Sequence, residues 1–64
     1  MKNILSMWEL RRYSRHELRV MYHLILAELA NYPEGSFDQQ IALINLRNIR
    51  YVLMTYQAYS PAPH

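Results

Sequence analysis

Hydrophobic residues recur at helical spacing in two long stretches of the chain. Between residues 15 and 31 they follow one another at alternating intervals of four and three, and residues 37–57 carry a second stripe of this kind. Such intervals place side chains on one face of an α-helix. We therefore predict an all-α fold with long helices at about 15–31 and 37–57.

The two stripes define the predicted core and dimer interface. On the first helix they comprise Leu18, Met21, Tyr22, Ile25 and Leu29, and on the second Ile41, Ile44, Ile49, Val52, Leu53 and Tyr56. Tyr32 and Tyr51 also lie on or near these stripes, whereas Tyr59 and Trp8 are the candidates for exposed contact residues, because large amphipathic side chains often anchor protein interfaces.

Three helix-start signals of the form Ser-x-x-Glu/Gln precede helical segments, at residues 6–9, 14–17 and 36–39. In such a capping box the serine and the residue three positions later each accept a hydrogen bond from the other's backbone N–H. The first two signals predict a short helix at about 7–12 and a break near Ser14. A continuous helix would bring Arg11, Ser14 and Arg15 into the apolar stripe.

The clearest turn is the segment 31–35. Pro33 disfavours helix at Tyr32, and Gly35 can adopt a positive φ. A connection this short between long amphipathic helices predicts an antiparallel helical hairpin. We expect a single domain over residues 1–60, with 61–64 as a flexible tail.

Apolar residues also lie outside the main stripes, which predicts further packing partners for both long helices. Val20, Leu24 and Ala27 lie nearly opposite the first stripe, and Leu43 and Met54 lie apart from the second. A chain of 64 residues without cysteine has no disulfide to supplement a small core. We expect two hairpins to pair as a homodimeric helical bundle. In the alternative arrangement, the short helix at about 7–12 folds back and covers the apolar face that lies outside the main stripe.

Residues suited to catalysis or metal binding are sparse and badly spaced. His16 and His23 are seven residues apart, whereas two zinc ligands on one helix favour a spacing of four. Glu17 and Glu28 are separated by about 16 Å of helix, too far for a shared acid–base step. We expect no enzyme activity, no metal and no cofactor.

No segment has the pattern of a secretion signal or a membrane span. The apolar run 4–8 is short and ends at Glu9, and the run 20–30 is interrupted by His23 and Glu28. We expect a cytoplasmic protein without membrane contact.

The net charge of +2 conceals an uneven distribution. In a hairpin, Glu28, Glu34 and Asp38 gather at the turn, whereas Lys2, Arg47, Arg50 and the arginines of residues 11–19 gather at the opposite, open end. The candidate surface for a protein partner or a nucleic acid comprises Trp8, Arg11, Arg12, Arg15, Arg19 and Tyr59. Basic residues gathered in this way suit either an acidic protein or a phosphate backbone.

Two functions are compatible with this surface. The first is a small non-enzymatic interaction protein that binds another protein. The second is a dimeric DNA-binding regulator, either through the basic patch alone or in the manner of ribbon-helix-helix repressors. In that last case residues 7–13 would form a strand with Glu9, Arg11 and Tyr13 on one face.

From Met1, through Ser14-Arg15-His16-Glu17-Leu18-Arg19, to Asn48-Ile49-Arg50-Tyr51, the chain resembles the short early proteins of lambdoid phages. It is similar to the open reading frames of about sixty residues in the exo–xis region. The resemblance implies a protein made in the host cytoplasm early in infection. It also implies a regulatory role, exerted by binding host proteins that control the host cell or phage development.

Overall fold

The computed structural model describes the backbone of residues 3–59 and the side chains of residues 3–56. It contains three helices, α1 (Met7–Leu10), α2 (Arg15–Leu29) and α3 (Phe37–Tyr59), and no strand over the described residues. The prediction of an all-α fold is confirmed. The predicted tail at 61–64 lies outside the described residues.

Each helix begins at a predicted serine cap. Ser14 and Glu17 form a complete capping box: the Glu17 N–H donates to Ser14 Oγ over 3.0 Å, and the Ser14 N–H donates to Glu17 Oε1 over 2.8 Å. At α3 the box is altered, because Gln39 Oε1 accepts from the N–H of Gly35 rather than from that of Ser36. Gly35 has a φ of 79°, as its place in the turn predicts.

The cap of α1 departs from the predicted box in a similar way. Ser6 Oγ accepts a hydrogen bond from the Glu9 N–H. The Glu9 carboxylate, however, accepts from the hydroxyl of Ser6 instead of from the backbone N–H of Ser6. The helix ends at Leu10, short of the expected limit near residue 12. Residues 11–14 then form the bend that separates α1 from α2.

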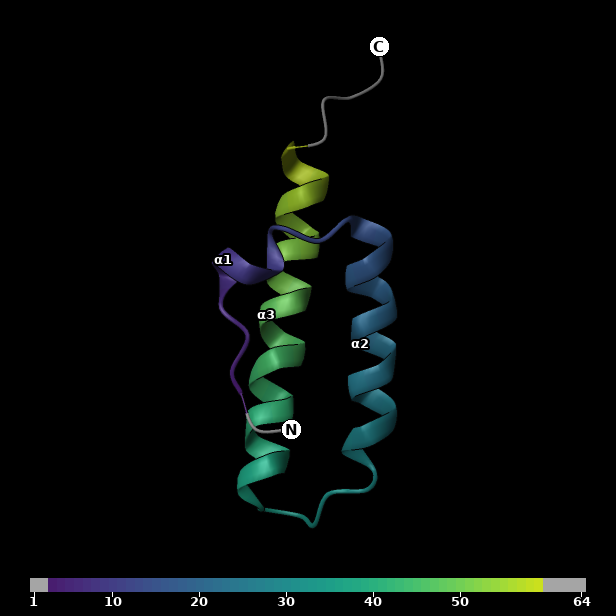
Figure 1. Ribbon diagram of the computed structural model, residues 1–64, viewed down its shortest axis with the longest axis vertical. Coiled ribbons are helices and arrows are strands. Elements are labelled where there is room, and N and C mark those ends of the chain that lie inside the picture. Colours follow the sequence, from purple (N-terminus) through teal and green to yellow (C-terminus); the bar gives the residue numbers. More distant parts are fainter. Residues whose placement is uncertain (1–2, 60–64) are drawn as a thin grey trace.

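Helices α2 and α3 form an antiparallel hairpin (Figure 1). α2 ends at Leu29, and the N–H groups of Asn31 and Tyr32 bond to carbonyls three residues back, which tightens the last turn before Pro33. α3 continues to Tyr59, past the expected end near residue 57.

The N-terminal segment covers the side of α3 that α2 leaves open. Figure 1 shows it running beside α3 into α1, on the side away from α2. Residues 3–6 are not helical; they are held by two buried amides of α3. Asn45 accepts from the Leu5 N–H and donates to the Asn3 carbonyl, and Asn48 donates to the Leu5 carbonyl. For α3, this is the fold-back arrangement that the sequence left as an alternative to pairing.

The core lies on both sides of α3. It contains the buried apolar residues Leu10, Leu18, Ile25, Ile41, Ala42, Leu46, Ile49 and Val52. Of the other stripe residues, those half-buried against this core are Met21, Tyr22, Leu29, Leu53 and Tyr56, and Ile44 is also half-buried. The sequence stripes did not include Leu10, which is fully buried, nor the buried amides Asn45 and Asn48.

Candidate protein-interaction surface

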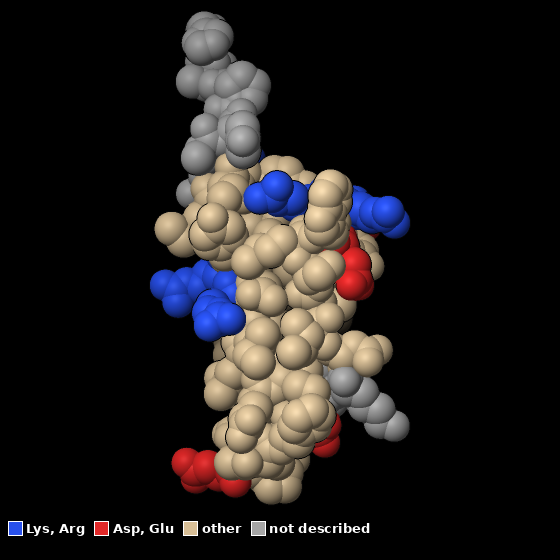
Figure 2. All heavy atoms as spheres, turned by 90° about the vertical axis from the view of Figure 1, so that its left-hand side faces the viewer, with Lys and Arg blue, Asp and Glu red and all other residues tan. Residues whose placement is uncertain are grey.

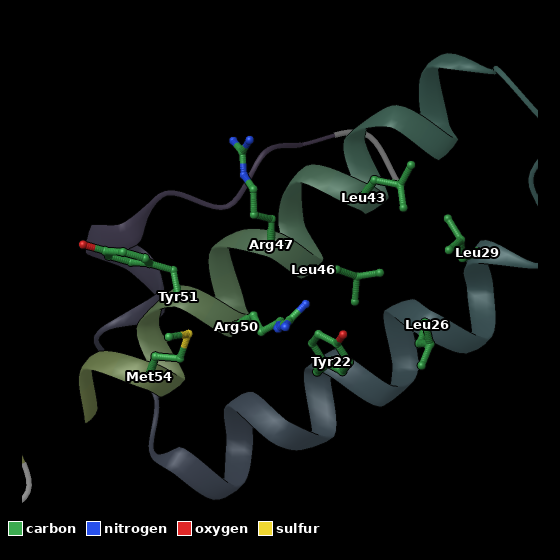
Figure 3. Close-up of a pocket in the computed structure, with 9 residues that line it drawn as sticks. All are labelled: Tyr22, Leu26, Leu29, Leu43, Leu46, Arg47, Arg50, Tyr51 and Met54. Atoms are coloured by element: carbon green, nitrogen blue, oxygen red, sulfur yellow. The ribbon is translucent and has the colours of Figure 1, made fainter. Parts of the chain in front are cut away.

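An open groove runs between α2 and α3 on one face of the hairpin (Figure 3). We call it the α2–α3 groove; its volume is about 510 Å³. Its lining comprises Tyr22, Leu26 and Leu29 of α2, and Leu43, Leu46, Arg47, Arg50, Tyr51 and Met54 of α3. Leu26, Leu43 and Met54 are 45%, 48% and 63% exposed, so the groove presents a substantial apolar surface to solvent.

Helical spacing explains why this surface stays open. Leu18 and Ile25 of α2 point into the core, and Leu26 follows Ile25 by one residue, which turns it about 100° toward the groove. On α3, Arg50 follows the buried Ile49 in the same way. The hairpin therefore buries one strip of each helix and leaves the neighbouring strip as a groove wall.

The end of the groove nearest the open end of the hairpin is basic. Arg50 lines the α2–α3 groove and two adjoining hollows, one with Arg15, Arg19, Leu53 and Met54, and one with Arg19, Tyr22, His23 and Leu53. In Figure 3, Arg50 reaches from α3 toward Tyr22 on α2, whereas Arg47 extends to the outer rim. We call Arg15, Arg19, Arg47 and Arg50 the arginine end.

Acidic residues lie elsewhere. None of the residues that line the groove or its two adjoining hollows is acidic. Glu17 and Glu28 occupy the opposite side of α2 from Leu26 by helical spacing. On the face shown in Figure 2, which is the side of α1, basic side chains gather in the half away from the turn, whereas acidic ones lie both near the turn and in that other half. The groove is therefore positive over part of its length and neutral over the rest.

The predicted contact residues lie at several places in the structure. Arg15 and Arg19 lie on the groove face with Arg50. Trp8 lies on α1 and is 82% exposed, whereas Arg11 lines a separate hollow with Val52, Thr55 and Tyr56. Arg12 is exposed in the bend, and the side chain of Tyr59 lies outside the described residues. The hollow lined by Arg11 is thus not the one lined by Arg15 and Arg19.

Sequence reasoning did not select several groove residues as a contact surface, namely Leu26, Leu43, Tyr51 and Met54, together with Arg47 and Arg50. Two signals pointed to them. Leu43 and Met54 lie apart from the main stripe of α3, and the arginines at 47 and 50 return to the level of Arg19 in a hairpin. Joining these signals required knowledge of which sides of α2 and α3 face each other.

The bend before α2 is fixed by a tyrosine of α3. The hydroxyl of Tyr56 lies 2.7 Å from the carbonyl oxygen of Tyr13 and 3.1 Å from that of Arg11, and donates to both. This contact fixes where α2 begins relative to α3. It therefore helps to position Arg15 at the arginine end.

Among the described residues, Glu17 and Tyr32 have shifted pKa values. The hydrogen bonds from the Ser14 backbone and hydroxyl lower the pKa of Glu17, with a smaller contribution from His16. Partial burial raises the pKa of Tyr32, helped by the negative charges of Glu28 and Asp38. Both shifts have structural causes at the ends of α2: Glu17 lies in its first turn, and Tyr32 follows its last turn.

Among the described residues, no group of three or more His, Cys, Asp or Glu side chains could hold a metal ion. None of the helices in this part of the chain has the length and apolar character needed to cross a membrane. α1 also occupies the residues that a ribbon-helix-helix fold would need as a strand. The strand expected in that alternative is wrong, because the Ser6 cap and the burial of Leu10 favour a helical turn here.

The fold and the groove define a small three-helix protein with an open surface that is part apolar and part basic. Comparisons of the chain with protein-family models, with curated proteins and with solved structures found no match.

Proposed function

We propose that this chain is a non-enzymatic interaction protein that binds another protein in the α2–α3 groove. The observation that carries the proposal is the exposure of Leu26, Leu43 and Met54 in a groove bordered by arginines. Exposed apolar surface with polar edges is typical of protein-binding sites. Arginine and aromatic residues, here Arg50 and Tyr22, are also enriched among residues that dominate binding energy.

The resemblance to lambdoid phage early proteins supplies a biological setting for this proposal. The partner would be a protein of the bacterial host, bound in its cytoplasm. Binding would alter host physiology or phage development by covering a surface of that partner.

Site-specific photo-crosslinking tests the proposal. A photoreactive phenylalanine analogue at Leu43, in the groove, is expected to give an adduct with a bacterial protein in cells that produce the chain. The control is the same analogue at Phe37, which is exposed but does not line the groove. Absence of a protein adduct at position 43, or an identical adduct at both positions, would overturn the assignment of the site.

We further propose that the chain forms a homodimer through the outer face of α2. Val20 and Leu24 are 44% and 61% exposed there, and Ala27 lies on the same face of the helix, about one turn beyond Leu24. A second copy packed on this face would cover side chains that one hairpin leaves in water. Sedimentation should give a dimer for the wild type and a folded monomer for Leu24→Asp. A wild-type monomer of 7.7 kDa would exclude pairing.

Nucleic-acid binding is the second candidate function, and the gathering of arginines at the open end favours it. A mobility shift with duplex DNA at low and moderate salt separates it from protein binding. Affinity that falls steeply with salt and is lost when Arg11, Arg12 and Arg15 are changed to Ala would support this second function. Absence of a mobility shift even at low salt would exclude it.

A further inference from the structure

We infer that the occupant of the α2–α3 groove is an amphipathic helix of another protein, with carboxylates beside one end of its apolar stripe. This inference rests on the proposed function and specifies the chemistry of the partner. It combines three features of the groove: its length, its apolar spacing and its charge.

The length and spacing fit a helix. The groove wall on α3 runs from Leu43 to Met54, which is about 16 Å of helix, or three turns. Tyr22, Leu26 and Leu29 line the opposite wall on the antiparallel helix α2. A third helix that lies between two antiparallel helices presents residues at i, i+4, i+7 and i+11 to both walls. Three turns of such a helix match the length of the groove.

The positive charge of the groove indicates which polar residues its occupant carries. The leucines lie toward the turn, and the arginine end lies toward the open end of the hairpin, with no acid in the lining. Guanidinium groups bind carboxylates through two parallel hydrogen bonds, which fixes both position and direction. The occupant's carboxylates should therefore lie beside Arg15, Arg19 and Arg50, and its purely apolar part beside Leu26 and Leu43.

A second copy of this chain does not meet these requirements on this face. Two copies joined through their grooves would enclose both arginine ends without an acid from either lining, and like charges at an interface cost affinity. A nucleic acid would satisfy the arginines but would leave Leu26, Leu29 and Leu43 against phosphate or water. An acidic amphipathic helix satisfies both halves of the groove.

Three synthetic peptides of eighteen residues test the inference against the full-length chain. The first carries leucines at i, i+4, i+7 and i+11, with glutamates flanking the first half of the stripe. The second replaces the glutamates by lysines, and the third replaces the leucines by serines. Titration by fluorescence anisotropy should show saturable binding of the first peptide. Binding should be at least about tenfold weaker for the second, because charge repulsion replaces pairing, and weaker again for the third.

Protein variants locate the bound peptide. Arg50→Ala should weaken binding of the first, glutamate-bearing peptide about tenfold. Leu43→Ser should weaken binding of the glutamate and lysine peptides by the same factor. Arg11→Ala is the matched control, because Arg11 is basic and exposed but lines a different hollow. Circular dichroism of each variant establishes that the helices remain. A spin label at the glutamate end should broaden the NMR signals of residues 15–19 more than those of residues 26–29.

The outcomes separate the inference from the proposed function. Equal binding of the glutamate and lysine peptides, no binding of either, or equal effects of Arg50→Ala and Arg11→Ala would overturn the inference. In each case a specific protein adduct at Leu43 would leave the proposed function standing. Dissociation of a wild-type dimer by the acidic peptide would show that the groove is a self-interface, which also overturns the inference.

Discussion

The side chain of Asn45 and the backbone of Leu5 are joined by a hydrogen bond of 2.6 Å across forty residues of sequence. Asn45 is fully buried, and its amide nitrogen also donates to the carbonyl of Asn3. One side chain of α3 therefore satisfies a backbone donor and a backbone acceptor of a segment that has no regular structure of its own. This pairing lets an extended segment pack against a helix without leaving its polar backbone groups unpaired.

Removal of this amide should detach the N-terminal segment. For Asn45→Ala we expect a loss of about 2–3 kcal/mol in the free energy of unfolding, since the Leu5 N–H loses its partner and a small cavity forms. Urea denaturation followed by circular dichroism measures the loss. Gln40→Ala serves as the control because Gln40 is an exposed amide of the same helix. Equal urea midpoints for the two variants would show that Asn45 does not hold the segment.

Leu10 should be the residue that anchors α1. It is the last residue of α1 and is fully buried in the core, although α1 has only four residues. We expect Leu10→Ala to lower the free energy of unfolding by about 2–4 kcal/mol, through lost burial and the cavity left behind. The neighbouring Trp8→Ala removes a larger side chain that is 82% exposed and should change stability by less than about 0.5 kcal/mol. A larger effect at Trp8 than at Leu10 would contradict this packing.

The hairpin could be predicted from sequence because its signals are local. The 4-3 spacing around Ile25 and Ile49 marks the buried strips, Ser14 and Ser36 mark the starts of α2 and α3, and Gly35 marks the turn. Each signal acts over a few residues. Periodicity therefore placed the long helices without knowledge of their partners.

The packing of the N-terminal segment could not be predicted in this way. Asn45 and Asn48 interrupt the apolar stripe of α3, and a polar residue within a stripe indicates exposure unless its partner is known. Those partners are the backbone groups of Asn3 and Leu5, which carry no side-chain signal. Leu10 lies in a helix too short to show periodicity. The α2–α3 groove could not be predicted from the sequence for a related reason, because its two walls come from different helices.

The hydroxyl of Tyr56 should stabilise the bend before α2. Tyr56→Phe removes the hydrogen bonds to the carbonyls of Arg11 and Tyr13 and keeps the ring. We expect a loss of about 1 kcal/mol and faster amide exchange in residues 11–14. Tyr51→Phe is the matched control, because the Tyr51 side chain is 53% exposed on the same helix. Unchanged exchange in the bend of the Tyr56 variant would rule out this role.

The capping box of α2 should make stability depend on pH below about 4.5. Hydrogen bonds from Ser14 lower the pKa of Glu17 from its ordinary value of 4.5, so the folded state binds this proton less readily than the unfolded state. The stabilisation is therefore present above pH 4.5 and is lost as the pH falls through the lowered pKa. We expect Glu17→Gln to lower the thermal midpoint at pH 7, and the gap to the wild type to narrow toward pH 2. Ser14→Ala removes the hydroxyl but keeps the backbone N–H, which contributes most to the lowered pKa, so in that background the effect of Glu17→Gln on the thermal midpoint should still vary with pH, over a smaller range. A gap that stays constant from pH 7 to pH 2 in the wild-type background would show that the carboxylate does not stabilise the start of α2.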